Sequence, residues 1–261
     1  MKIGVPNENA DGERRVALVP DVVASLKKDE NHHVMVETGA GDAAGHPDSQ
    51  YSEAGADLVD GATAWGADVV LCVGTPSAEK IGSLKQGQVL IGHLDPWTAA
   101  DTNRALAAAG VTSFAMEAVP RTTRAQAMDA LSSQAAAGGY AATLIAARES
   151  GRFFGMMTTA AGTVPPAKVL VLGAGVAGLQ AVATAKRLGA IVTGCDIRRA
   201  AWEQIASLGG RPLELDFIPD AEAEGGYARP LTDEENAQVR DALGENATRQ
   251  DVIITTAAIP G

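Results

Sequence analysis

The sequence predicts an α/β protein built from two doubly wound, parallel-sheet (Rossmann-like) domains joined by a long helix. Short runs rich in Val and Ile alternate with Ala-rich stretches along the 261 residues, a pattern typical of parallel α/β units. A glycine-rich turn, Gly173–Gly178, directly follows one of the apolar runs. Aromatic residues make up only 4% of the chain and apolar residues 46%, so we expect a core of small and branched aliphatic side chains.

The first α/β domain is predicted to span residues 1–124. Several of its strand candidates are apolar on both faces, as expected for strands that helices cover on both sides. Helices are expected at Pro20–Lys28 and Thr98–Ala109, and Gly110 is a suitable C-cap glycine for the second. The five expected strands are Lys2–Pro6, His33–Thr38, Asp68–Val73, Val89–Leu94 and Thr112–Glu117.

A connecting helix over residues 125–151 is predicted to follow a polar loop that begins at Pro120. Gly151 and the Gly155–Pro166 stretch then interrupt the helical pattern. The second domain is predicted to span residues 152–261 and shows four strand candidates, whereas a complete dinucleotide-binding fold usually has six. We therefore expect it to be truncated at its C-terminus. The four strands are expected at Lys168–Leu172, Ala190–Asp196, Pro212–Leu215 and Asp251–Thr255.

Charge and cysteine content argue against several classes of protein. The net charge is -11 and the pI about 4.8, so neither nucleic acid nor anionic lipid is an expected direct partner. Cys72 and Cys195 lie within apolar, strand-like runs, which favours buried thiols over a disulfide or a nucleophile. The histidines lack metal-ligand spacing, so no metal site is expected. The first residues predict a strand rather than a signal peptide. The longest apolar stretch, Ala135–Ala147, is too short to cross a bilayer.

Gly173–Gly178 has the spacing of the dinucleotide-binding fingerprint, GxGxxG, between an apolar strand and a helix. Gly173 would allow the tight turn, Gly175 would let a pyrophosphate approach the backbone, and Gly178 would bring helix and strand close together. The helix N-terminus would supply free N–H donors and partial positive charge. Asp196 follows Gly178 by eighteen residues, at the end of the next strand, where an acid meets the adenosine ribose.

The acid also bears on the choice between NAD(H) and NADP(H). A carboxylate at Asp196 would repel a 2′-phosphate, which favours NAD(H), although Arg198 and Arg199 could soften that repulsion. The residues expected to contact the dinucleotide are Gly173, Ala174, Gly175, Val176, Gly178, Asp196, Ile197 and Arg198.

A second polar constellation lies between Arg121 and Gln134. If this segment is helical, Gln126, Asp129 and Ser132 would form a ladder along one helix face. A solvated helix start with Asp129 as a local cap explains the same periodicity, and the spacing alone favours that interpretation over a functional one.

The chain resembles the NAD(H)-binding component, or alpha subunit, of proton-translocating NAD(P) transhydrogenase. The resemblance extends along the whole chain, and its Arg–Gln–Asp pattern separates this family from its relatives. The matching pieces are Gly12–Ala17, Arg121–Gln134, Met156–Pro166, Gly175–Ala181, Thr255–Ala257 and Ile259–Gly261.

The resemblance implies a function that needs partners. Arg121, Gln126, Asp129 and Ser132 would lie against the nicotinamide of NAD(H), with Gln126 reaching toward NADP(H) held on a partner beta component. Gly226 would belong to a segment that folds over the bound nucleotide. A membrane component would conduct protons, and this component would be a homodimer. The chain would then be cytoplasmic, peripheral to the inner (plasma) membrane through its partner subunits.

Two other interpretations remain. Alanine dehydrogenase resembles this chain in its first half, but its chemistry needs a Lys to hold the keto acid and a His to move a proton. The matching segments here place no Lys within Leu71–Pro76 and place Asp95 where the His is expected, with His93 two residues away. Arg15, which would contact a substrate carboxylate in that enzyme, is here expected to pair with an acid of the first domain. The chain could also be a non-catalytic NAD(H)-binding module.

Overall fold

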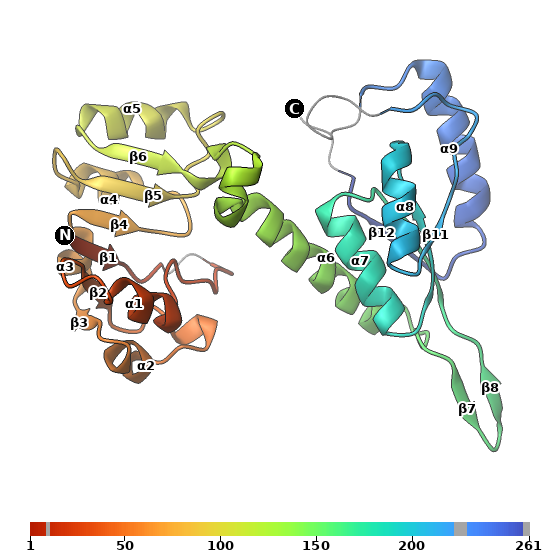
Figure 1. Ribbon diagram of the computed structural model, residues 1–261, viewed down its shortest axis with the longest axis horizontal. Coiled ribbons are helices and arrows are strands. Elements are labelled where there is room, and N and C mark those ends of the chain that lie inside the picture. The colour runs from red at the N-terminus through yellow and green to blue at the C-terminus, as the bar shows by residue number, and fades with distance from the viewer. Residues whose placement is uncertain (9–10, 222–228, 258–261) are drawn as a thin grey trace. The chain divides into compact units, whose positions relative to one another are not determined.

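The computed structural model describes residues 1–8, 11–221 and 229–257 (Figure 1). The chain divides into two compact units, Met1–Ala130 and Leu131–Gly261. Each unit contains its own parallel sheet, so the predicted α/β class with two such sheets is confirmed.

The first unit holds a six-stranded parallel sheet in the order β3-β2-β1-β4-β5-β6. Its chain order reverses between β1 and β4, and Gly4 of β1 pairs with both Met35 of β2 and Val70 of β4. The short strand β3 was not among the expected ones because its three residues lie at the edge of the sheet and two of them are exposed. The strands are β1 Lys2–Val5, β2 His33–Glu37, β3 Asp57–Val59, β4 Val69–Leu71, β5 Val89–Gly92 and β6 Thr112–Ala115.

Short helices connect these strands and complete two apolar clusters on the sheet. One cluster packs Val5, Val34 and Val36 against Val23 and Tyr51, and the other packs Val70 and Leu90 among apolar residues of the neighbouring helices. The helices are α1 Pro20–Leu26, α2 Asp48–Glu53, α3 Gly61–Trp65, α4 Ala78–Ser83 and α5 Ala100–Ala108, with 3-10 turns η1 Asp42–Ala44, η2 Met116–Ala118 and η3 Thr123–Met128.

The second unit contains a four-stranded parallel sheet in the order β11-β10-β9-β12. Val169 of β9 pairs with Val192 of β10 on one side and with Val252 of β12 on the other. The third expected strand is reduced to two residues, and Pro212 within it has no N–H to donate to a ladder. The elements are β9 Lys168–Leu172, α7 Val176–Arg187, β10 Ile191–Cys195, α8 Arg199–Ser207, β11 Arg211–Pro212, α9 Asp233–Ala247 and β12 Val252–Thr255.

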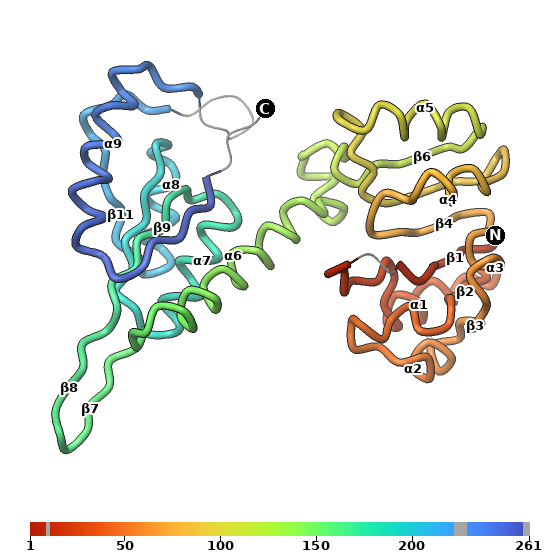
Figure 2. The backbone as a smooth tube through the Cα atoms, turned by 180° about the vertical axis from the view of Figure 1, so that it is seen from behind, coloured from red at the N-terminus to blue at the C-terminus, as the bar shows by residue number. Residues whose placement is uncertain are grey.

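The long helix α6 (Ala130–Glu149) begins five residues later than the helical pattern suggested. Residues 123–128 form the 3-10 turn η3, and Asp129 has ψ 82°, which interrupts helical geometry between the two segments. From Leu131 onward, α6 belongs to the second unit, where Ala142 and Ala146 pack against the core formed by β9, β10 and α7. Helices α6 and α7 lie side by side (Figure 2).

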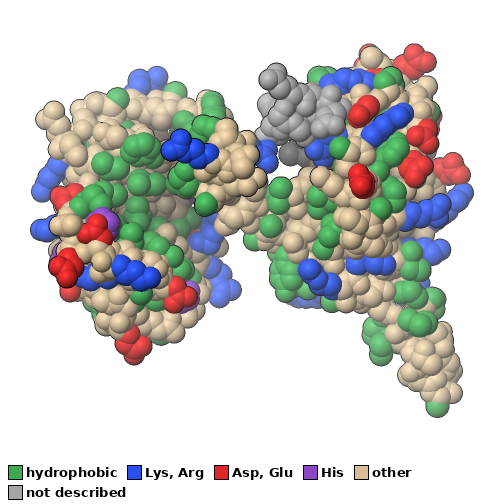
Figure 3. Space-filling view, in the orientation of Figure 1, with side chains coloured by type: hydrophobic (Ala, Val, Ile, Leu, Met, Phe, Trp, Pro, Cys, Tyr) green, Lys and Arg blue, Asp and Glu red, His purple; other side chains and the backbone are tan. Residues whose placement is uncertain are grey.

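The Gly155–Pro166 stretch, expected only to interrupt the pattern, forms an antiparallel hairpin of β7 (Met157–Thr159) and β8 (Gly162–Val164). Gly162 at its turn has φ 137°, which favours glycine. The Gly155–Pro166 stretch contains no charged residue, and its Met156, Met157 and Val164 are exposed. Figure 3 shows hydrophobic side chains, in green, on the hairpin.

Among the described residues, no helix combines the length and the apolar character needed to cross a bilayer.

The contact between α6 and α7 depends on a glycine. A Cβ on Gly139 would lie 2.0 Å from the Ala177 carbonyl oxygen, whereas a Cβ on Gly138 would meet no atom within 4 Å. Thr143, one turn further along α6, is fully buried and donates its hydroxyl to the carbonyl oxygens of Gly139 and Ala181.

Gly139→Ala should therefore lower the free energy of unfolding by about 1–3 kcal/mol, because the helices must move apart. The matched control Gly138→Ala should raise it by about 0.5–1 kcal/mol, because Ala is the better helix former. Thermal unfolding of both variants measures the difference. Equal stability of the two would contradict the packing described.

Candidate functional site

The turn between β9 and α7 is held by close backbone contacts. Gly173 has φ 88°, and its N–H donates to the Cys195 carbonyl oxygen of β10 at 2.8 Å. A Cβ on Gly178 would lie 1.8 Å from the Gly173 carbonyl oxygen, so only glycine allows α7 to approach the end of β9 this closely. These contacts give Gly173 and Gly178 the structural roles expected of them.

The N-terminus of α7 is open toward the carboxyl end of the sheet. Gly175 precedes the helix in an extended conformation, and a Cβ on it would meet no atom within 4 Å. The first intrahelical hydrogen bond runs from the Leu179 N–H to the Gly175 carbonyl oxygen, so the N–H groups of Val176, Ala177 and Gly178 precede the helical ladder. An uncapped helix start of this kind suits an anion such as a pyrophosphate.

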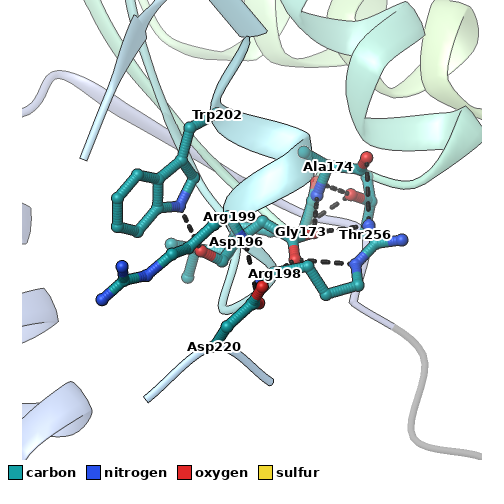
Figure 4. Close-up of polar contacts among 9 residues, drawn as sticks. Gly173, Ala174, Asp196, Arg198, Arg199, Trp202, Asp220 and Thr256 are labelled. Atoms are coloured by element: carbon teal, nitrogen blue, oxygen red, sulfur yellow. Dashed lines mark hydrogen bonds and ion pairs between the residues drawn. The ribbon is translucent and has the colours of Figure 1, made fainter. Parts of the chain in front are cut away.

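Asp196 lies just after β10, and its carboxylate is hydrogen-bonded to the glycine turn (Figure 4). Its Oδ2 accepts the Ala174 N–H at 2.7 Å and Arg198 Nη2 at 2.8 Å, while its Oδ1 accepts Arg198 N and Arg198 Nε, both at 2.9 Å. The residue is only 8% exposed. Burial raises the pKa of the Asp196 carboxyl, but the hydrogen bonds from Arg198 and Ala174 outweigh burial and hold the pKa below its ordinary value.

The residues after Asp196 extend this network away from the turn. Trp202 donates its indole N–H to the Asp196 carbonyl oxygen at 2.8 Å, and the Arg199 guanidinium lies 5.8 Å from the centroid of the Trp202 ring. Ile197 is half-buried, and its carbonyl oxygen accepts the Ala221 N–H. Gly226, expected to close over the nucleotide, lies outside the described residues.

Thr256, just after β12, was missed as a site residue. Its hydroxyl lies 2.8 Å from the Gly173 carbonyl oxygen and 3.1 Å from that of Leu172, and it would touch a Cβ on Gly178 at 2.7 Å. Strand order reverses between β9 and β12, and ligands of open α/β sheets bind at such a reversal. A hydroxyl residue directly after the strand that pairs with the fingerprint strand is the signal that could have identified it.

The second polar constellation is placed differently from the expected ladder. Gln126 is exposed in η3, Asp129 lies in the break between η3 and α6, and Ser132 lies in the first turn of α6, so the three do not share one helix face. Arg121 and Asp129 do come together, with Arg121 Nε 3.7 Å from Asp129 Oδ2.

Arg15 of the first unit pairs with an acid of that unit, as predicted. Its Nε and Nη2 donate to the two carboxylate oxygens of Glu13 at 2.9 and 2.7 Å. The side-chain hydrogen bond from Arg15 is the largest cause that lowers the pKa of Glu13 to about 2.

Glu8 lies at the reversal of strand order in the first unit, and no sequence motif singled it out. Its carboxylate accepts the N–H groups of Val73 and Gly74 at 2.6 and 2.9 Å, just beyond β4. Burial raises the pKa of Glu8 above its ordinary value despite these bonds. The backbone donors at this point of the first sheet therefore already have an acidic partner within the chain.

Comparison with known proteins identifies the family. Residues 4–138 match the model of the alanine dehydrogenase/PNT N-terminal domain, and residues 142–261 match that of the alanine dehydrogenase/PNT C-terminal domain. The chain therefore belongs to the alanine dehydrogenase/PNT family, whose members include nicotinamide-nucleotide oxidoreductases.

Within that family the chain is similar to transhydrogenase alpha subunits. It is 44% identical to NAD(P) transhydrogenase subunit alpha of Haemophilus influenzae over 261 residues, which cover 100% of this chain and 51% of the relative. The transhydrogenase structure from Sinorhizobium meliloti aligns with a TM-score of 0.87 at 43% identity, covering 100% of this chain and 70% of that one. Alanine dehydrogenase of Mycobacterium tuberculosis is 36% identical over 235 residues, covering 88% of this chain and 62% of the enzyme. The chain thus spans about half the length of the transhydrogenase subunit from Haemophilus influenzae.

Gly175, where a Cβ has space, and Gly178, where a Cβ would clash, predict different effects of the same substitution. Gly175→Ala should change the free energy of unfolding by less than about 1 kcal/mol, because its Cβ has space. It should nevertheless weaken dinucleotide binding by about tenfold or more, because the methyl group would stand where the pyrophosphate approaches. Gly178→Ala should lose both stability and binding. Thermal unfolding and calorimetric titration with ADP-ribose test this, and full affinity in Gly175→Ala would contradict the site.

The Glu13–Arg15 pair should make stability depend on pH. The pKa of Glu13 is about 2 in the folded chain and 4.5 in the absence of partners, so its contribution is fully present above pH 4.5 and is lost as the pH falls toward 2. Glu13→Gln should therefore lower the unfolding temperature at neutral pH and approach the unsubstituted chain in acid. Glu30→Gln, at an exposed loop position, is the control. A deficit for Glu13→Gln that is constant with pH would exclude the ion pair as its cause.

Proposed function

We propose that this chain is the NAD(H)-binding component of a proton-translocating NAD(P) transhydrogenase. In this role it presents NADH for direct hydride transfer to NADP+ on a partner component, and the transfer is coupled to proton movement across a membrane. The observation that carries the proposal is the match to a transhydrogenase alpha subunit over 100% of this chain. The open helix start at Gly175, beside Asp196, is a suitable place for the pyrophosphate and adenosine ribose.

The proposed reaction mainly requires that the two nicotinamide rings be held in position. A hydride that moves between two nicotinamide carbons makes and consumes no proton at those carbons, so the protein need supply neither a general acid nor a general base. The two rings must be held about 3–3.5 Å apart with water excluded. Bound NAD(H) would supply the transferable hydride, and the chain's own residues would orient it.

The Arg121–Gln134 segment is the proposed positioning element. The Arg121–Asp129 pair, 3.7 Å apart, would hold the loop against the nicotinamide carboxamide and ribose. Exposed Gln126 on η3 would reach the partner's nucleotide, and Ser132 would add a hydroxyl from the first turn of α6. Amide, hydroxyl and charged groups of these kinds hold a carboxamide well, because they offer both donors and acceptors.

Alanine dehydrogenase is the rival function, and the residues of the first unit argue against it. The segment Leu71–Pro76, which ends β4 and follows it, contains no Lys, and the Gly74 N–H within it donates to the Glu8 carboxylate. Arg15 is paired with Glu13. Asp95 adopts φ 48°, and its carboxylate accepts the Thr98 hydroxyl, so it is turned into its own loop. Among the described residues, a keto acid would therefore find no Lys within Leu71–Pro76, and Arg15 is already paired with Glu13.

The proposed assembly has three parts. A beta component would hold NADP(H), a membrane component would conduct protons, and this chain would act as a homodimer. It would lie on the cytoplasmic side of the inner (plasma) membrane and be attached there through the partner subunits. Without an acceptor-bearing partner, the same chain would be a non-catalytic NAD(H)-binding module.

The test is an exchange assay with the chain and a purified NADP(H)-binding component of a transhydrogenase. NADH-dependent reduction of an NADP+ analogue is expected only when both proteins are present. Pyruvate with ammonia is the parallel acceptor, supplied without the partner. Consumption of NADH by pyruvate and ammonia would replace this proposal with an amino-acid dehydrogenase.

Gln126→Asn should slow hydride transfer at least about tenfold while changing NADH affinity less than about threefold, because the shorter amide no longer reaches between the nucleotides. Gln86→Asn makes the same chemical change at an exposed position before β5 and should affect neither quantity. Stopped-flow measurements give the rate of hydride transfer, and equilibrium titrations give the affinity for NADH. A proportional loss in both would make Gln126 a simple binding residue.

A further inference from the structure

The carboxylate that should receive the adenosine ribose is already saturated. Each oxygen of Asp196 accepts two hydrogen bonds, from Ala174 N and Arg198 Nη2 on Oδ2, and from Arg198 N and Nε on Oδ1. An ionised carboxylate offers about four acceptor positions in all. Ribose hydroxyls can therefore bind Asp196 only in place of a donor that is present now.

The donors differ in how easily they can leave. The N–H groups of Ala174 and Arg198 belong to the backbone of the turn and of the chain entering α8, so both are fixed by the fold. The Arg198 guanidinium sits on a flexible side chain that is 20% exposed and supplies the other two bonds. Its Nη2 also approaches the Ala174 carbonyl oxygen at 3.3 Å, so it bridges the end of β10 and the glycine turn (Figure 4).

We propose that Arg198 is the specificity-determining residue of the ribose site, because it competes with the adenosine ribose for Asp196 and neutralises the charge that would reject a 2′-phosphate. This inference rests on the proposed binding of NAD(H). Binding of the unphosphorylated ribose requires the guanidinium to release at least one carboxylate oxygen. The released guanidinium would then be a ready donor for a 2′-phosphate, since Arg binds phosphate with two parallel hydrogen bonds.

Asp196 by itself therefore does not set the preference between NAD(H) and NADP(H), contrary to the simplest reading of an acid at this position. A bare carboxylate would favour hydroxyls and repel phosphate. The Asp196–Arg198 pair, with its oxygen and nitrogen 2.8 Å apart, presents no net charge and thus discriminates less. Arg199 carries the same charge one residue later but faces Trp202, so it does not share this role.

The test measures binding of two ligands that carry no nicotinamide, ADP-ribose and 2′-phospho-ADP-ribose, by calorimetric titration. Arg198→Ala should bind ADP-ribose about threefold to tenfold more tightly and 2′-phospho-ADP-ribose more weakly, because Asp196 gains free acceptors and regains its charge. Arg199→Ala removes the same charge without freeing Asp196 and should leave the ratio of the two affinities within about twofold of the unsubstituted chain.

Arg198→Gln is the second variant, because Arg198→Ala leaves a buried carboxylate without its cation and could reduce stability. Arg198→Gln retains an N–H donor and should still raise the affinity for ADP-ribose relative to that for 2′-phospho-ADP-ribose. Thermal unfolding checks that each variant is folded. Equal changes in Arg198→Ala and Arg199→Ala, or weaker binding of ADP-ribose by both folded Arg198 variants, would overturn the inference. If the unsubstituted chain binds neither ligand, the proposed NAD(H) site itself fails.

Discussion

The site depends on one steric constraint, the contact of the first turn of α7 with the end of β9. The Gly173 carbonyl oxygen occupies the space that a Cβ on Gly178 would need, at 1.8 Å, and the Thr256 hydroxyl fills the remaining gap against the same carbonyl. Because Gly178 has no side chain to hold the helix away from the strand, the first turn of α7 starts directly at the carboxyl end of the sheet. The backbone alone therefore makes this position suitable for an anion.

The two sheets differ in what occupies the backbone N–H groups at the point where strand order reverses. In the first unit, the Glu8 carboxylate occupies the N–H groups of Val73 and Gly74, so an incoming anion would meet both a filled donor pair and a negative charge. In the second unit the acid, Asp196, binds the Ala174 N–H beside the turn and leaves the start of α7 open. The same strand order thus yields one acidic, internally satisfied edge and one edge suited to a dinucleotide.

Much of this arrangement was predictable from local pattern. Parallel strands, the fingerprint and the spacing to Asp196 depend on hydrophobic periodicity and glycine placement, and these are local properties of the chain. The start of α6 was not predictable to the residue, because Ala125–Met128 favour helix while the backbone at Asp129 breaks it. The hydrogen-bond partners of Asp196 and Glu8 could not be predicted either, because they depend on which loops meet at the edge of each sheet. Spacing predicted that Asp196 ends the strand next to the glycine turn, but it did not indicate that Arg198 occupies the carboxylate.

The most direct measurement of the central claim is the backbone amide spectrum of the ¹⁵N-labelled chain during titration with ADP-ribose. The largest shifts are expected on the N–H groups of Val176, Ala177 and Gly178, with smaller changes at Ala174 and Arg198, where the carboxylate contacts rearrange. Shifts concentrated at Val73 and Gly74 of the first unit, with the start of α7 unaffected, would contradict it, because the anion would then have displaced Glu8 rather than bound the open helix.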